Sequence, residues 1–207
     1  MSRRVWRWSL GPGTGLLAVV LAVLGMWEIG QGVWIHLKAR LAQHLLQRAW
    51  ARTQAGASDV VPWPWADTVP VARLRVPVHG VDLIVLDGVS GRTLTWGPGH
   101  AASSARPGAP GTAIVSGHRD THFRFLERLR PGDEVVVETP AGGPVRFVVR
   151  ASTVVDARTA VVRRDADGAA LVLLTCYPFD GIRPGGPLRY AVAAEAASPA
   201  ARRTSGD

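Results

Sequence analysis

The sequence predicts a mainly β protein whose folded domain follows two N-terminal helices, and three observations support this. First, 207 residues with 47% hydrophobic and 19% charged residues are enough for one buried core of ordinary size. Second, the periodicity changes after Pro70 from helical spacing to short runs of β type. Third, turn residues separate those runs, which is typical of a closed or sandwiched β domain.

The first helix is expected within residues 1–30. No charged residue lies between Arg7 and Glu28, and such an uncharged helical run is about 30 Å long, the thickness of a bilayer core. We therefore expect a cytoplasmic stub and a transmembrane helix that starts near Thr14. A cleaved signal peptide is the competing interpretation, but no convincing Ala-x-Ala site follows Trp27. Arginines before the span favour an N-terminus inside the cell.

Residues 31–70 are expected to form a juxtamembrane amphipathic helix and a linker. Apolar residues recur every four positions from Val33 to Ala49, which gives one helical stripe, flanked by Trp34, Leu46 and Trp50. Such a stripe packs on the following domain or lies at the membrane surface. The Pro62-Trp63-Pro64-Trp65 segment cannot continue a helix and marks the linker.

Residues 71–197 are expected to form the β domain, and residues 198–207 a small, polar, disordered tail. Asp87-Gly88 and Pro131-Gly132-Asp133 supply turns between strands. No internal repeat has a fixed period, which disfavours solenoids and propellers. The expected strands cover residues 72–76, 81–86, 111–116, 134–138, 145–156, 170–176 and 188–193.

The charge of the chain does not indicate a nucleic-acid partner. The net charge is +8, but the arginines that supply it are scattered along the chain. Cys176 is the single cysteine, so an intramolecular disulfide is excluded. Its thiol could be buried filler, an exposed group or a nucleophile.

Three residues at strand ends could carry chemistry together. Cys176 ends the most hydrophobic strand, and His118 follows another strand within a turn. A cysteine nucleophile needs a neighbouring base or imidazolium to hold the thiolate at neutral pH. Arg189, in the last strand, could donate to a carbonyl oxygen as charge builds on it. Taken one by one, Cys176 could instead be a buried structural cysteine, and Arg189 could be a solvated arginine on an exposed face.

Other polar residues offer weaker sites. His118 and His122 are spaced to chelate a metal if helical, but no third ligand accompanies them, so we expect no metal and no cofactor. His79 and His100 are expected in loops. The carboxylates that could orient the histidine are Asp120, Asp156 and Asp180, which sequence alone does not rank.

Three segments resemble the signature segments of the sortases, the cysteine transpeptidases of bacterial surfaces. In chain order they are Ser116-Gly117-His118-Arg119-Asp120, Leu174-Thr175-Cys176 and Leu188-Arg189-Tyr190-Ala191-Val192. Val172 replaces the first threonine of the family's Thr-Leu-x-Thr-Cys motif. The segments at Trp65–Thr68, Gly97–His100, His118–Phe125 and Cys176–Asp180 are more specifically similar to the Gram-negative sortase class.

The resemblance implies a sortase-like closed β-barrel of about eight strands with His118, Cys176 and Arg189 as catalytic residues. Thr175, Asp120 and Tyr177 would support them. It also implies an LPXTG-like sorting-signal protein as substrate, a thioester on Cys176 and an amine acceptor. The enzyme would sit in the inner membrane by a single span, with the catalytic domain in the periplasm.

Two alternatives to a transpeptidase remain open. One is a non-catalytic envelope β-barrel that binds a peptide through the same groove and buries Cys176. The other is a hydrolase that releases anchored proteins instead of joining them.

Overall fold

The computed structural model describes residues 12–140, 142–162, 168–181 and 185–197. The predicted stub before Pro12 and the predicted tail at 198–207 lie outside these ranges. The chain divides after Leu41 into two compact units, residues 1–41 and 42–207.

One helix, α1 (Pro12–Gln54), covers the segments in which the sequence predicts two helices. In the N-terminal unit its large apolar side chains are exposed, among them Leu16, Leu21 and Trp27. Among the described residues, no helix has an apolar stretch that meets the length and hydropathy needed to cross a bilayer.

The last turns of α1 belong to the C-terminal unit and pack on its β domain. Leu46 and Trp50 are buried against Ile84 and Leu86. Ala49 of the predicted stripe is buried too, as are Leu46 and Trp50, which flank that stripe. Leu41 of the predicted stripe is instead 59% exposed.

The linker after α1 is also packed on the β domain. Trp63 meets Trp96 edge to face with the ring centroids 5.0 Å apart. The Gln43 side chain donates to the Trp96 carbonyl oxygen over 2.9 Å. The linker and the end of α1 are therefore part of the folded unit.

Eight strands form a closed barrel in the order β1-β2-β3-β4-β7-β8-β6-β5. Short helices lie between them, namely η1 (Pro77–His79), α2 (Gly91–Trp96) and η2 (Arg124–Arg128). The strands are β1 (Pro70–Val76), β2 (Val81–Asp87), β3 (Gly99–His100), β4 (Gly111–Ser116), β5 (Glu134–Thr139), β6 (Gly142–Asp156), β7 (Ala169–Cys176) and β8 (Leu188–Ala196).

The mainly β fold and the closed barrel agree with the sequence-based prediction, with one strand added. The strand not predicted is β3, which has only two residues and bridges β2 to β4. His100 therefore lies in a strand and is 5% exposed, so its assignment to a loop was wrong. A strand of two residues has no periodicity to detect.

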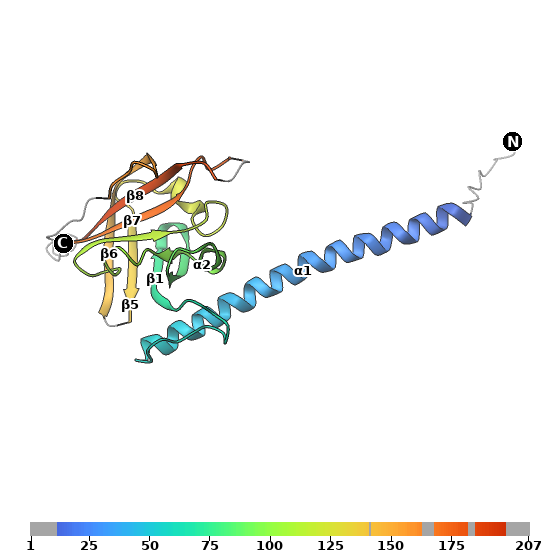
Figure 1. The fold of residues 1–207 in the computed structure, drawn as a ribbon, viewed down its shortest axis with the longest axis horizontal. Helices are drawn as coiled ribbons and strands as arrows, with labels where there is room; N and C mark the ends of the chain where they lie inside the picture. The colour runs from blue at the N-terminus through green and yellow to red at the C-terminus, as the bar shows by residue number, and fades with distance from the viewer. Residues whose placement is uncertain (1–11, 141, 163–167, 182–184, 198–207) are drawn as a thin grey trace, which may run out of the picture. The chain divides into compact units, whose positions relative to one another are not determined.

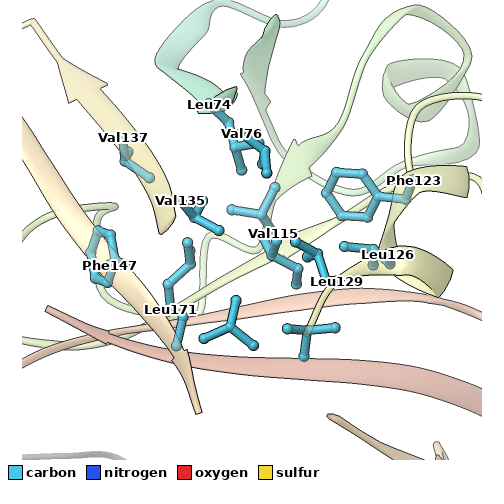
Figure 2. Packing of buried hydrophobic residues seen from close by; sticks show 14 of the residues in the cluster. Leu74, Val76, Val115, Phe123, Leu126, Leu129, Val135, Val137, Phe147 and Leu171 are labelled. Carbon is cyan, nitrogen blue, oxygen red and sulfur yellow. The ribbon is translucent and has the colours of Figure 1, made fainter. Parts of the chain in front are cut away.

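The barrel interior holds the core of the molecule. Alternation along each strand sends every second side chain inward, and Figure 2 shows Leu74, Val115, Val135, Phe147 and Leu171 meeting there from five strands. The segment between β4 and β5 adds three residues that close one end of the barrel: Phe123, Leu126 and Leu129.

Candidate active site

The neighbouring strands β4 and β7 run parallel, so both end at the same edge of the barrel. Their register pairs Gly111 with Ala169 and continues to Ser116 with Leu174. One residue further, the Gly117 amide donates to the Leu174 carbonyl oxygen over 3.1 Å. The segments that carry His118 and Cys176 are therefore joined by backbone hydrogen bonds although they lie far apart in the chain.

Strand alternation places the side chains of this edge on the outside of the barrel. Val115 in β4 and Leu173 in β7 point into the core and are fully buried. The opposite parity includes Ser116 in β4 and Cys176 in β7, both partly exposed. His118, two residues after Ser116, is exposed. The site thus faces solvent and not the core.

Arg189 lies directly opposite Cys176. The two residues are Cα partners in the antiparallel pair of β7 and β8, so their side chains share one face of the sheet. The guanidinium is partly exposed and donates through Nη1 to the Gly186 and Leu188 carbonyl oxygens, over 2.6 and 2.9 Å. These contacts hold a positive charge on the strand next to the thiol.

Thr175 connects the two candidate catalytic segments from the inside. Its side chain is buried, and Oγ1 donates to the Gly117 carbonyl oxygen over 2.7 Å. A Cβ on Gly117 would come within 2.8 Å of the Phe123 ring, so the close approach requires glycine here. The backbone segments next to His118 and Cys176 are therefore packed tightly against each other.

Two other residues offered by the sequence, Asp120 and Tyr177, contact neighbouring side chains. The exposed Asp120 carboxylate accepts from Arg119 Nε over 3.3 Å. Tyr177 packs against the barrel core and stacks on Tyr190 with ring centroids 6.3 Å apart. Asp120 therefore contacts the arginine that follows His118, and Tyr177 contacts the core and Tyr190.

Asp156 is placed beside the arginine. Its carboxylate binds the Arg158 guanidinium, with 2.5 Å between Oδ2 and Nη2. Hydrogen bonds from Arg158 hold the pKa of Asp156 below its usual value, and the positive charge of Arg189 lowers it further. This carboxylate contributes to the field around Arg189.

His122 lies close enough to His118 for the two rings to influence each other. Burial lowers the pKa of His122, and the charge of His118 lowers it further. Within the described ranges, no group of three or more His, Cys, Asp or Glu side chains is arranged to hold a metal ion. The histidine pair thus has no third ligand among these residues.

A groove of about 800 Å³ lies along the outside of β4. Ile114 lines it and lies two residues before Ser116, so the two side chains share one face of β4. The opposite wall comes from Ala160, Val161 and Val162, between β6 and β7. An extended peptide could lie in this groove and approach the ends of β4 and β7.

Two arginines near the site received no role from sequence reasoning. Arg119 directly follows His118 and is 8% exposed, which is unusual for a charged residue. Both Arg119 and Arg124 bind backbone oxygens just beyond Cys176. The sequence signal was an arginine inside the turn that carries the histidine, but its partners are distant in the chain.

Comparison with known proteins identifies the family. A family model described as Sortase domain matches residues 74–197. The chain is 30% identical to Sortase D of Bacillus subtilis (strain 168) over 119 residues, 58% of this chain and 60% of that protein. It is 32% identical to Sortase SrtE1 of Streptomyces coelicolor over 136 residues, which are 61% of this chain and 37% of that protein.

Solved structures of sortases are similar to this chain. Sortase C-1 from Actinomyces oris has a TM-score of 0.55 and 29% identity, with 62% of this chain and 73% of that chain covered. Sortase A from Corynebacterium diphtheriae has a TM-score of 0.57 over 76% of this chain and 84% of its own, and at 22% identity it supports the fold alone.

The chain belongs to the sortase family, whose members are cysteine transpeptidases. This confirms the family predicted from the three signature segments. The chain spans less than two thirds of the length of each of the two relatives, and the comparisons identify the family without its class.

Proposed function

We propose that this chain is a membrane-anchored sortase that cleaves an LPXTG-like sorting signal through a thioester on Cys176 and transfers the acyl group to an amine. The observation that carries the proposal is the pairing of Cys176 with Arg189, at the edge where β4 delivers His118. These three residues supply a nucleophile, a positive donor and an acid.

The first half-reaction forms the thioester. The Cys176 thiolate attacks the carbonyl carbon of the signal's threonine, and the resulting oxyanion is stabilised by the Arg189 guanidinium. The carbon–nitrogen bond then breaks, and the His118 imidazolium gives its proton to the departing amine. Sulfur remains bonded to the acyl carbon.

The second half-reaction releases the acyl group. An incoming amine gives up a proton to neutral His118 and attacks the thioester carbon, which returns the thiolate as leaving group. Water reacts in the same way and yields hydrolysis as a side reaction. Because the two substrates react in turn with one covalent intermediate, the kinetics are expected to be ping-pong.

The groove along β4 supports a peptide substrate. It is lined by Ile114, on the face of β4 that also carries Ser116, and its Val161 and Val162 side chains offer apolar contacts. An extended sorting signal that lay there could bring its scissile carbonyl to the outer ends of β4 and β7.

Membrane attachment is proposed through residues 1–30, with the barrel in the periplasm. The uncharged run between Arg7 and Glu28 and the exposed side chains of Leu16, Leu21 and Leu24 support it. A shared membrane would bring enzyme and substrate together at high effective concentration. Membership of the Gram-negative class is part of the same proposal.

The test is to trap the thioester on the full chain. An LPXTG-type peptide is incubated with the protein, which is then quenched in acid and measured by intact-mass spectrometry. We expect a mass increase equal to the acyl fragment, lost in Cys176→Ala and decreased in His118→Ala and Arg189→Ala. If peptide binds but no adduct or cleavage product forms with any related signal peptide, the chain is a binding module and the proposal is wrong.

The same incubation with and without amines separates transfer from hydrolysis. Transfer predicts an amide product whose yield rises with the amine concentration while the hydrolysis product falls. If only the hydrolysis product forms across a range of primary amines, the chain is a hydrolase and transpeptidation is wrong.

A further inference from the structure

Arg119 links the histidine segment to the backbone that follows the cysteine. Its Nη1 donates to the Pro178 carbonyl oxygen over 2.5 Å, and its Nη2 donates to the Gly181 carbonyl oxygen. Both acceptors lie within five residues of Cys176, whereas Arg119 immediately follows His118. The side chain therefore spans the gap between the two segments of the candidate active site.

The geometry requires a guanidinium. Pro178 and Gly181 form a turn in which the Gly181 amide donates to the Pro178 carbonyl oxygen over 3.3 Å. Two separate nitrogens of one planar group reach the two carbonyl oxygens at the same time, and Nε reaches Asp120. A lysine ammonium lacks this fork and would satisfy fewer of these acceptors.

The lack of a side chain at Gly181 leaves room for the Arg119 guanidinium. A Cβ placed on Gly181 would lie 2.7 Å from Arg119 Nη1 and 3.2 Å from the Pro178 carbonyl oxygen. The guanidinium is buried, so it has little room to retreat. Glycine at 181 and arginine at 119 are thus mutually dependent.

Arg124 adds a second, outer contact to the same turn. Its Nη1 donates to the Phe179 carbonyl oxygen over 2.7 Å, and its guanidinium carbon lies 5.9 Å from the centroid of the Phe179 ring. Three carbonyl oxygens beyond the cysteine, at positions 178, 179 and 181, are therefore bound by arginines of the histidine segment.

We propose that Arg119 is a positioning residue that fixes the turn after Cys176 against the segment of His118, so that the thiol and the imidazole keep one separation through both half-reactions. This inference rests on the proposed function and assigns Arg119 no contact with the substrate. Arg124 reinforces the same turn from the solvent side, where its side chain is more exposed.

The test compares Arg119→Met and Arg119→Lys with the unsubstituted full chain. Turnover of an LPXTG-type peptide and the pH profile of Cys176 alkylation are measured. We expect Arg119→Met to lower kcat at least tenfold and leave KM within twofold, because groove contacts are unchanged. Alkylation at neutral pH should slow and its midpoint should shift to higher pH. Arg119→Lys should recover part of the loss.

Gly181→Ala provides an independent route to the same displacement. It keeps every charge but occupies the space of the guanidinium, so it should lower kcat in the same way and shift the alkylation profile in the same direction. In the double variant the effects should be less than additive, since either change alone releases the turn. If Arg119→Met does not fold, the single variant Gly181→Ala tests the positioning role by itself.

Arg146→Met is the matched control, because Arg146 forms an exposed ion pair with Glu134 away from this turn. It should leave both measurements unchanged. If Arg119→Met or Gly181→Ala folds and has the kcat and alkylation profile of the control, the positioning role is wrong. If the unsubstituted chain forms no thioester, the proposed function has failed instead. A changed alkylation profile in Arg119→Met would then still show that Arg119 positions the turn after Cys176.

Discussion

The position of the candidate catalytic residues depends on a few buried contacts. Cys176 and Arg189 are adjacent through strand register, whereas the His118 segment is held by the Thr175 hydroxyl and the Arg119 guanidinium. Removing one such partner leaves a buried acceptor unsatisfied, which costs more than the net value of the bond. Substitutions here should therefore affect stability and rate together.

Replacement of Thr175 by valine tests this directly. The isosteric Thr175→Val removes the donor to the Gly117 carbonyl oxygen, so we expect the free energy of unfolding to fall by about 1–3 kcal/mol. The measurement is urea unfolding of the full chain, followed by thiol alkylation in the folded state. Thr175→Ser keeps the hydroxyl and should stay nearer to the parent. Equal stability of the valine and serine variants would contradict the argument.

His122 makes the folded state sensitive to mild acid. Burial, and then the charge of His118, hold its pKa below the ordinary 6.5. Because the unfolded chain then binds a proton more readily than the folded chain, stability is lost as the pH falls through about 6.5 towards the lower folded pKa. His122→Gln should therefore lose less stability between pH 8 and pH 5 than the parent chain loses.

Thermal unfolding at each pH measures this difference. The control is His44→Gln, since His44 is exposed on α1. That variant should follow the parent curve. A parent chain whose melting temperature falls no faster in acid than that of His122→Gln would exclude a role for the half-buried His122 ring.

At the level of elements, the end of α1 and the barrel form one packed unit. Leu46 is fully buried and contacts the apolar cluster on β2, whereas Leu41, just over one turn earlier, is exposed. The helix thus contributes to barrel stability through its last turns.

Truncation of Leu46 should reveal this contribution. Leu46→Ala creates a cavity beside Ile84 and Leu86, so we expect a loss of about 2–5 kcal/mol in the free energy of unfolding of the full chain. Leu41→Ala removes the same atoms from an exposed position and should change it by no more than about 0.5 kcal/mol. Urea unfolding compares the two. Similar losses in both variants would show that the helix end does not stabilise the barrel.

For the whole molecule, the sequence predicted the barrel well where strands are long enough to alternate. The strands that carry Val115 and Leu173 were predicted because they are apolar runs that end at turn residues. The structure places both side chains in the core. β3 escaped detection because it has two residues. The buried face of α1 was predicted at Ala49 and at the flanking Leu46 and Trp50, but helical spacing alone did not show that Leu41 is exposed.

The candidate site was predictable only in part. His118, Cys176 and Arg189 were singled out by their residue types and strand ends, and the structure brings their segments to one edge, although their catalytic roles remain proposals. The fork from Arg119 to the Pro178 and Gly181 carbonyl oxygens could not be predicted, because backbone acceptors have no signature in a sequence. The same is true of the space required at Gly181.

Membrane topology can be tested through the single cysteine of the whole molecule. We expect a membrane-impermeant maleimide to label Cys176 in cells whose outer envelope is opened, because the proposed orientation puts the barrel outside the inner membrane. Cys176→Ser is the control for background. Labelling that requires rupture of the inner membrane would reverse the orientation, and full release of the protein by alkaline carbonate would exclude the anchor.

The parallel pairing of β4 with β7 separates the fixed parts of the molecule from the parts that can vary. Cys176 and the segment of His118 belong to these two neighbouring strands, while the groove wall at Ala160–Val162 comes from the connection between β6 and β7. Ala160, Val161 and Val162 lie outside the strands, so substitutions at these three positions should leave the register of β4 and β7 unchanged. A new preference for peptide sequence could therefore be obtained by redesigning this connection alone, with the chemistry left intact.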